Sequence, residues 1–284
     1  MNPEHIIGLP QYKDWIKESR EISDIRELKI SGFFEVIVVP DNKASLTLMS
    51  LDPEIIKDTI THCEDGQLRL KINGSYMYGG KTLNYEENAD EIMQKVNSNP
   101  STHFSGRILN YTENGDVNIH MQTINFGGKM ASSFMSDMKH YEHPMLVVIG
   151  CPTIEKVKVD GSGDVTAHGF TPDQLKIKSS GSGDIVFTNF KGGSVEIELS
   201  GSGDITMDGQ VESLDLRLSG SGDICLKALE AQNVNARLMG SGDIKIQALA
   251  SVNARLMGTG KILITGNPTI RNTKGLGTGK IKFK

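Results

Sequence analysis

The sequence is poor in cysteine, in aromatic residues and in long apolar runs. Its three cysteines, Cys63, Cys151 and Cys225, are odd in number and far apart, so they imply no disulfide framework. No stretch of about 18 apolar residues predicts a membrane-spanning helix. The start lacks a basic segment followed by an apolar one, so no signal peptide is visible.

Positive charge is not in excess either. The chain has 30 Lys and Arg against 35 Asp and Glu, which gives a net charge of -5 and a pI near 5.8. Such a balance is unfavourable for a nucleic-acid surface, so we expect no nucleic-acid partner. No phosphate loop, catalytic nucleophile motif or haem motif is present, and we expect no cofactor.

The dominant feature of the sequence is a five-residue phrase that recurs at intervals of 18 to 20 residues. It reads Gly-Ser-Gly-Asp-Val or Gly-Ser-Gly-Asp-Ile five times and Gly-Thr-Gly-Lys-Ile twice. The copies start at Gly161, Gly181, Gly201, Gly220, Gly240, Gly258 and Gly277. Self-similarity at such a period is typical of a solenoid, whose units stack and bury a shared core.

Within one repeat, apolar residues occupy alternate positions. From Val195 to Met207 the odd positions are apolar or glycine, which predicts strands with one buried face. The connections are too short for a crossover helix, so successive strands must be parallel. We therefore predict an all-β fold, a right-handed, single-stranded parallel β-helix with a rise of about 4.8 Å per coil. The inward-facing glycines are expected at a corner, where a Cβ would collide with the opposite wall or φ is positive.

The N-terminal residues 1–24 are predicted to form a helical cap on an end of the solenoid. Tyr12, Trp15 and Ile16 are expected to form the apolar stripe of one short helix. Residues 25–72 are predicted to be the first coils, because Lys29–Val36 aligns with Lys158–Val165, with Glu35 in place of Asp. Its bulky Phe33 and Phe34 suggest a divergent rung that closes the end of the solenoid.

Two local signals follow in this first segment. Asp52, Pro53 and Glu54 predict the start of a helix that runs through Ile60. Asp65 and Gly66 predict a turn into the strand 68–72.

Residues 73–143 are predicted to be an insert, either elaborated coils or a side domain. The segment contains an expected helix at Glu86–Val96 and a hairpin signal at Asn114 and Gly115, between the strands 107–111 and 117–121. Residues 144–284 then form the repetitive β-helix.

The chain resembles the family described as putative auto-transporter adhesin, head GIN domain, a family of unknown function also called DUF2807. The resemblance lies in Ser31-Gly32-Phe33-Phe34-Glu35-Val36, in Asp65-Gly66-Gln67-Leu68-Arg69-Leu70 and in the serial Gly-Ser-Gly-Asp phrases. It covers residues 25–72 and 144–284. It implies a right-handed parallel β-helix, exported or lipid-anchored in bacteria, with no catalytic residues to carry over. A location in the cell envelope is thus expected, with the cytoplasm as the alternative because no signal peptide is visible.

One outward row of the repeat is acidic. It consists of Asp164, Asp184, Asp204, Asp223 and Asp243, and Lys261 and Lys280 close it. Carboxylates one rung apart repel each other by on the order of 1 kcal/mol in water. We expect each Asp to accept hydrogen bonds from a Ser or Thr hydroxyl and from backbone N–H groups at the glycine turn. The alternative is a row of oxygens that binds a cation or another ligand, although no dedicated metal site is expected.

A second outward row is basic and contains Arg217, Arg237 and Arg255, preceded by Lys158 and Lys178 and interrupted by Glu198. A solvated face is the simpler interpretation of this row. The alternative is a binding patch for an anionic glycan or a lipid headgroup.

Taken together, these features favour a non-catalytic bacterial surface protein that acts as an adhesin or ligand-binding module. A glycan or another surface protein is the expected partner, and oligomers are compatible with the pattern. The alternative is a polysaccharide lyase or glycosidase. Five equivalent Asp residues, and the lack of Trp and Tyr between Cys151 and Lys284, count against that enzyme.

Overall fold

The structure is a computed structural model. It describes residues 2–72, 76–78, 81–83, 108–113, 116–121, 139–141 and 145–284. The chain divides into two units, one made of Met1–Lys71 with Pro144–Lys284 and the other of Ile72–His143.

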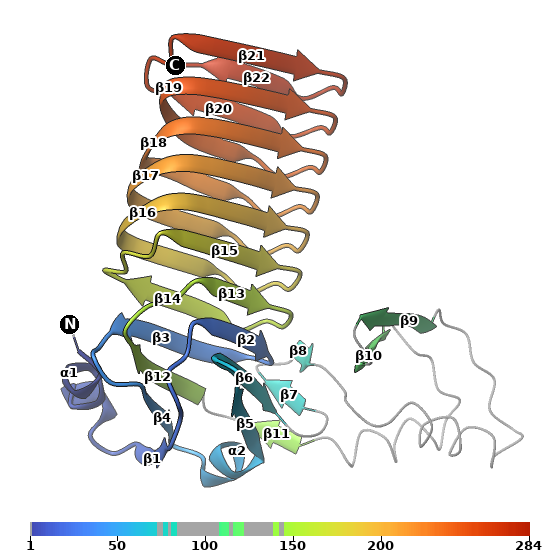
Figure 1. Cartoon of the computed structure of the whole chain (residues 1–284). Coiled ribbons are helices and arrows are strands. Elements are labelled where there is room, and N and C mark those ends of the chain that lie inside the picture. The colour runs from blue at the N-terminus through green and yellow to red at the C-terminus, as the bar shows by residue number, and fades with distance from the viewer. Residues whose placement is uncertain are drawn as a thin grey trace, which may run out of the picture. The chain divides into compact units, whose positions relative to one another are not determined.

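The larger unit is a β-solenoid of stacked parallel strands (Figure 1). Its repetitive part contains β13 (Lys156–Val159), β14 (Asp164–His168), β15 (Gln174–Ser179), β16 (Ile185–Leu199), β17 (Ile205–Leu218), β18 (Ile224–Leu238), β19 (Ile244–Leu256), β20 (Lys261–Thr265), β21 (Ile270–Gly275) and β22 (Lys280–Phe283). The predicted parallel solenoid is thus confirmed. Its right-handed sense and single-stranded classification stay predictions.

Each coil has two walls that meet at the glycine corner. We call one the Asp wall, formed by β14, β20, β22 and the first residues of β16 to β19, each beginning at or directly after the Asp or Lys of the phrase. We call the other the Asn wall, formed by β13, β15, β21 and the last residues of β16 to β19. The pairing keeps like residues in register, for example Ile185 with Ile205 on the Asp wall and Asn235 with Asn253 on the Asn wall.

The core consists of aliphatic columns between the two walls. Ile185, Ile205, Ile224, Ile244 and Ile262 lie one above another, and each is fully buried. Burial of one such side chain stabilises the fold by about 1.5–3 kcal/mol. The alternation seen in the sequence therefore places the apolar side chains as predicted.

The glycines form two columns at the corner, but for a different reason from the one predicted. A Cβ on Gly201 would lie 1.8 Å from the carbonyl oxygen of Gly181, and a Cβ on Gly203 would lie 2.0 Å from that of Gly183. The obstacle is therefore the backbone of the preceding coil and not the opposite wall. Neither Gly201 nor Gly203 has a positive φ. Glycine is needed because the chain stacks backbone on backbone at this corner.

The rung that contains Lys29 and Glu35 pairs in the predicted register, but it does not lie at the end of the solenoid. β2 (Glu27–Ser31) pairs with β13, with Lys29 opposite Lys158, and β3 (Phe34–Pro40) pairs with β14, with Glu35 opposite Asp164. On their other edges, β2 pairs with β6 (Gln67–Ile72) and β3 with β12 (Met145–Cys151). This rung is therefore internal and does not close the end. All seven residues of β12 are buried, so it can continue the core beyond β3.

The N-terminal segment is not one helix. It forms α1 (Pro3–Ile7), a 3-10 turn at Pro10–Tyr12 and β1 (Ile16–Arg20), which pairs antiparallel with β4 (Ser45–Ser50). The expected stripe of Tyr12, Trp15 and Ile16 was wrong, because the edge of β4 offers Ile16 a strand partner. Tyr12 and Trp15 instead pack with Ile6 on the outward side of β3 and β12.

The other local signals of this unit hold in part. The α2 helix (Pro53–Asp58) begins as predicted, with the Asp52 side chain accepting a 2.9 Å hydrogen bond from the Glu54 N–H. It ends before Ile60, which belongs to β5 (Thr59–Glu64). Asp65 and Gly66 both have positive φ, as expected of the turn that leads into β6.

In the smaller unit, β9 (Ile108–Glu113) and β10 (Asp116–Met121) form an antiparallel hairpin with Glu113 opposite Asp116. This confirms the hairpin predicted around Asn114 and Gly115. β7 (Tyr76–Tyr78) pairs with β8 (Lys81–Leu83) and with β11 (Lys139–Tyr141). The helix expected at Glu86–Val96 lies outside the described residues.

Candidate functional site: the two walls of the solenoid

The acidic row on the Asp wall is a hydrogen-bonded ladder. One carboxylate oxygen of each Asp accepts a bond from the backbone N–H of the equivalent residue in the next coil, at 2.7 to 2.8 Å. The acceptors are Asp164, Asp184, Asp204, Asp223 and Asp243, and the last donor is Lys261. The expected hydroxyl donors are absent from the described contacts of this row. The backbone donor belongs to the next coil, not to the same turn.

The first four steps of the ladder each close a ring of hydrogen bonds. The Asp204 N–H donates to the Asp184 side chain, and the Asp204 carbonyl accepts a 2.9 Å bond from the Ile185 N–H. After Lys261 there is no carboxylate to continue the ladder. The Lys280 N–H instead donates a 3.3 Å hydrogen bond to the carbonyl of Gly260. The side chains thus satisfy backbone donors at the corner, where the strands are interrupted.

Asp223 is the member of this row with a side-chain ion pair. Lys245 Nζ lies 2.9 Å from its second carboxylate oxygen. Burial alone would raise the pKa of Asp223, but the bonds from Lys245 and from the Asp243 N–H outweigh it and hold the pKa below its ordinary value. Among the described residues, no three His, Cys, Asp or Glu side chains converge where a metal ion could bind.

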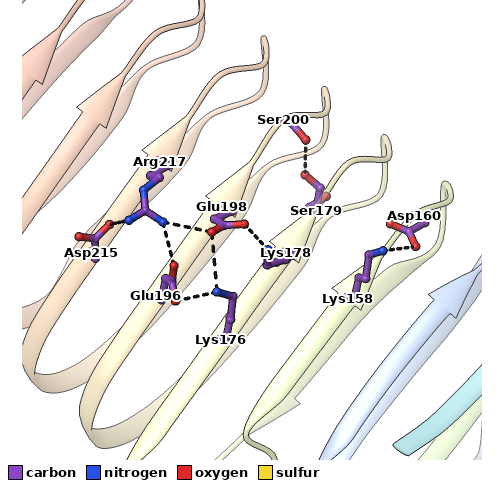
Figure 2. A network of polar contacts seen from close by, with 10 residues as sticks. All are labelled: Lys158, Asp160, Lys176, Lys178, Ser179, Glu196, Glu198, Ser200, Asp215 and Arg217. Atoms are coloured by element: carbon purple, nitrogen blue, oxygen red, sulfur yellow. Dashed lines mark hydrogen bonds and ion pairs between the residues drawn. The ribbon is translucent and has the colours of Figure 1, made fainter. Parts of the chain in front are cut away.

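The Asn wall carries an ion-pair network in its earlier coils (Figure 2). The two carboxylate oxygens of Glu196 lie 2.8 Å from Lys176 Nζ and 2.8 Å from Arg217 Nη1. Those of Glu198 lie 2.6 Å from Lys178 Nζ and 3.1 Å from Arg217 Nη1. The hydrogen bond from Lys176 lowers the pKa of Glu196, and the bond to Glu196 raises the pKa of Lys176 and of Arg217. The charges of these coils therefore neutralise one another.

The later coils of the same wall carry cations without such partners. Arg237 pairs in register with Arg255, and Arg255 with Lys274. In the described part of the chain, none of these three side chains makes an ion pair or a hydrogen bond. The predicted basic row therefore divides into two parts. Arg217 belongs to the ion-pair network, whereas Arg237 and Arg255 lie outside it and face solvent.

Beside these cations runs a column of amides that the sequence analysis did not single out. Asn235 Nδ2 donates to Asp215 at 2.6 Å, and Asn253 Nδ2 donates to Asn235 Oδ1 at 3.3 Å. Asn272 continues the column in register. The signal was present in the sequence, since Val234–Gly240 and Val252–Gly258 are duplicates with Asn at the same place.

An open groove of about 920 Å³ runs over the Asn wall from Glu27 to Asn272. Asp215, Asn235 and Asn253 line it, together with the neighbouring residues Leu214 and Val234. The groove crosses one coil after another and meets equivalent residues in each. Its shape suits an elongated ligand better than a compact one.

Comparison with solved structures shows the same fold in bacterial proteins. A putative adhesin from Bacteroides fragilis NCTC 9343 superposes with a TM-score of 0.69 at 21% identity, over 96% of this chain and 98% of that one. A putative lipid binding protein from Parabacteroides distasonis ATCC 8503 gives 0.59 at 16% identity, over 95% and 97%. A putative adhesin from Parabacteroides merdae ATCC 43184 gives 0.59 at 14% identity, over 95% and 97%.

No curated protein matches the sequence. None of the helices in the described residues has the length and hydropathy of a membrane span. The family described as putative auto-transporter adhesin, head GIN domain (DUF2807), matches residues 113–268, more than half of the chain. The match begins inside the segment predicted as an insert and does not include residues 25–72, which carry part of the resemblance. The chain belongs to this adhesin-like family, as its repeat predicts.

Proposed function

We propose that this protein is a non-catalytic adhesion module of the bacterial cell surface or envelope, and that it binds an extended glycan in the groove of the Asn wall. The family and the adhesin-like structures support a role in adhesion. The groove is the observation that carries the choice of site, because it crosses successive coils and is lined in each by polar side chains at the same register position. A repeating surface of this kind suits a repeating ligand.

Two acids of the groove, Glu196 and Glu27, support a binding role over a glycosidase. Catalysis by two carboxylates needs one of them to stay protonated through a raised pKa. The pKa of Glu196 is lowered by its bond to Lys176. At Glu27, burial alone would raise the pKa, but bonds from Lys156 and Gln67 outweigh it and lower the pKa. Both side chains are therefore held as ionised partners of nearby lysines.

A glycan array tests the proposal with two matched substitutions. Ser213 is exposed and lines the groove, whereas Ser202 is exposed at the glycine corner, outside it. We expect the wild-type protein and Ser202→Trp to bind the same polysaccharides, and Ser213→Trp to lose them because the indole fills the groove. Equal binding by the two variants, or no binding by the wild-type protein, would overturn the choice of site. Release of reducing ends from a bound polysaccharide would overturn the non-catalytic role.

A further inference from the structure

We infer that the later coils of the Asn wall select a polyanionic glycan that carries carboxylates, through a strip of unpaired cations at Arg237, Arg255 and Lys274. The inference rests on the proposed glycan groove and names its ligand class. In the earlier coils, Lys176, Lys178 and Arg217 are neutralised by Glu196, Glu198 and Asp215. In the strip, the described contacts provide no counter-charge.

The contrast between earlier and later coils is a matter of side-chain composition. The outward positions before and after Arg237 are Asn235 and Met239, and those around Arg255 are Asn253 and Met257. Around Lys274 they are Asn272 and Leu276. No acid occupies these positions of the last three coils, although the whole chain has a net charge of -5. A polyanion is therefore repelled by the protein as a whole and attracted locally to the strip.

The spacing of the cations suits a polymer. Register pairing places the three side chains on neighbouring strands, which lie about 4.8 Å apart. Arginine can bind a carboxylate through two parallel hydrogen bonds, and the carboxylate replaces the missing counter-charge. A chain of acidic sugars that lies along the solenoid axis would present carboxylates to successive rungs.

The neighbouring columns favour a sugar polymer over a membrane surface. Each Asn amide has two N–H donors, and Asn235 and Asn253 each commit only one to the described ladder. The remaining donors and lone pairs can bind sugar hydroxyls in the groove. On the other side of the strip, Met239, Met257 and Leu276 are 49%, 53% and 67% exposed and offer adaptable apolar contacts. A flat bilayer would meet the strip but would not enter the groove, and three cations alone attract an anionic surface only weakly.

The experiment measures binding of an oligogalacturonate by titration calorimetry at low and at higher salt. The double variant Arg237→Gln with Arg255→Gln removes two charges from the strip. The control, Lys282→Gln with Lys284→Gln, removes two charges from exposed residues beyond the strip. We expect the first variant to weaken binding by about tenfold or more and the control to bind within about twofold of wild type. Binding by the wild-type protein should weaken as salt increases.

Three outcomes would overturn the inference. They are equal losses in the two double variants, no binding of oligogalacturonate by the wild-type protein, and binding to phosphatidylserine vesicles that depends on Arg237 and Arg255 while oligogalacturonate binding does not. A neutral oligosaccharide separates the two proposals. If Ser213→Trp abolishes binding of the neutral ligand while the acidic one fails to bind, the groove stands and only the anionic selectivity falls.

Discussion

The backbone N–H of Asp223 donates a 2.8 Å hydrogen bond to Oδ1 of Asp204, which lies 19 residues earlier and one coil away. The same relationship joins every Asp of the row to its successor. The carboxylate supplies an acceptor at the corner, where the regular ladder of strand hydrogen bonds is interrupted. The phrase that defines the repeat therefore encodes both the close stacking of the glycines and the satisfaction of the backbone beside them.

Substitution of Gly201 is expected to destabilise the solenoid strongly. In Gly201→Ala the new Cβ meets the Gly181 carbonyl oxygen at 1.8 Å, so two coils must move apart. We expect a loss of at least about 3 kcal/mol in the free energy of unfolding, measured in urea. Gly275→Ala is the matched control, since a Cβ on Gly275 would have no atom within 4 Å and the stability should change little. Similar losses in both variants would contradict the glycine stacking.

Replacement of Asp204 separates its acceptor role from its charge. Asp204→Ala leaves the Asp223 N–H without its side-chain acceptor and should cost about 1 kcal/mol of unfolding free energy. Asp204→Asn keeps an oxygen acceptor and removes repulsion from the neighbouring carboxylates, so it should be as stable as wild type or more so. Chemical denaturation measures the order of stability among wild type and the two variants. Glu212→Ala, at an exposed position, is the control for loss of a charge. Equal stability of Asp204→Ala and wild type would show that the ladder contributes nothing.

The ion pair of Asp223 and Lys245 predicts a pH dependence of stability. The folded-state pKa of Asp223 lies below its ordinary value of 3.8, so its contribution is present above that value and is lost as pH falls through the folded pKa. The stability difference between wild type and Lys245→Gln should therefore be largest near about pH 6 and shrink below about pH 4. Thermal unfolding across this range measures it. Exposed Lys227→Gln should show no such convergence, and a constant difference for Lys245→Gln would contradict the linkage.

Arg20 fixes the C-terminal end of α2 to β1. Its guanidinium donates to the carbonyls of Ile56, at 2.9 Å, and of Thr59. Arg20→Ala should lower the unfolding free energy by about 1.5–3 kcal/mol, because two carbonyls lose a charged donor. Arg20→Lys should recover only part of this, since one ammonium lacks the planar fork of the guanidinium. The control is Arg26→Ala, because the Arg26 side chain is 70% exposed and makes one ion pair, with Glu155 at 3.7 Å. Urea denaturation of the three variants measures these losses. Equal midpoints for all three would contradict this role of Arg20.

The three cysteines should differ in reactivity. Burial raises the pKa of the Cys151 thiol to about 12, whereas Cys63 and Cys225 are partly exposed. At about pH 8, iodoacetamide should modify Cys63 and Cys225 in the folded protein and Cys151 only after unfolding. Mass spectrometry of the labelled peptides measures this. Labelling of Cys151 in the folded protein would contradict its buried position.

Local and periodic features were predictable from the sequence. The alternation of Ile205 and its neighbours indicated the inward face, and the alignment of Glu35 with Asp164 indicated the register of the first rung. The amide column was not singled out, because a single Asn235 on an outward position indicates nothing until its neighbours stack on it. The division of the basic row depended on contacts between different coils, such as Arg217 with Glu196, which alternation alone does not specify.

By itself, the sequence determined that this chain coils into a solenoid, because a strict period with alternating apolar residues has one way to bury its core. The tertiary structure decided where the chain departs from that period. It placed β12 beside β3, and it placed Ile16 in β1, which pairs with β4. Both pairings cover a strand edge whose backbone N–H and C=O groups would otherwise lack partners. It also decided which cations stay unpaired, because charge neutralisation depends on the residues one coil away and not on the neighbours along the chain.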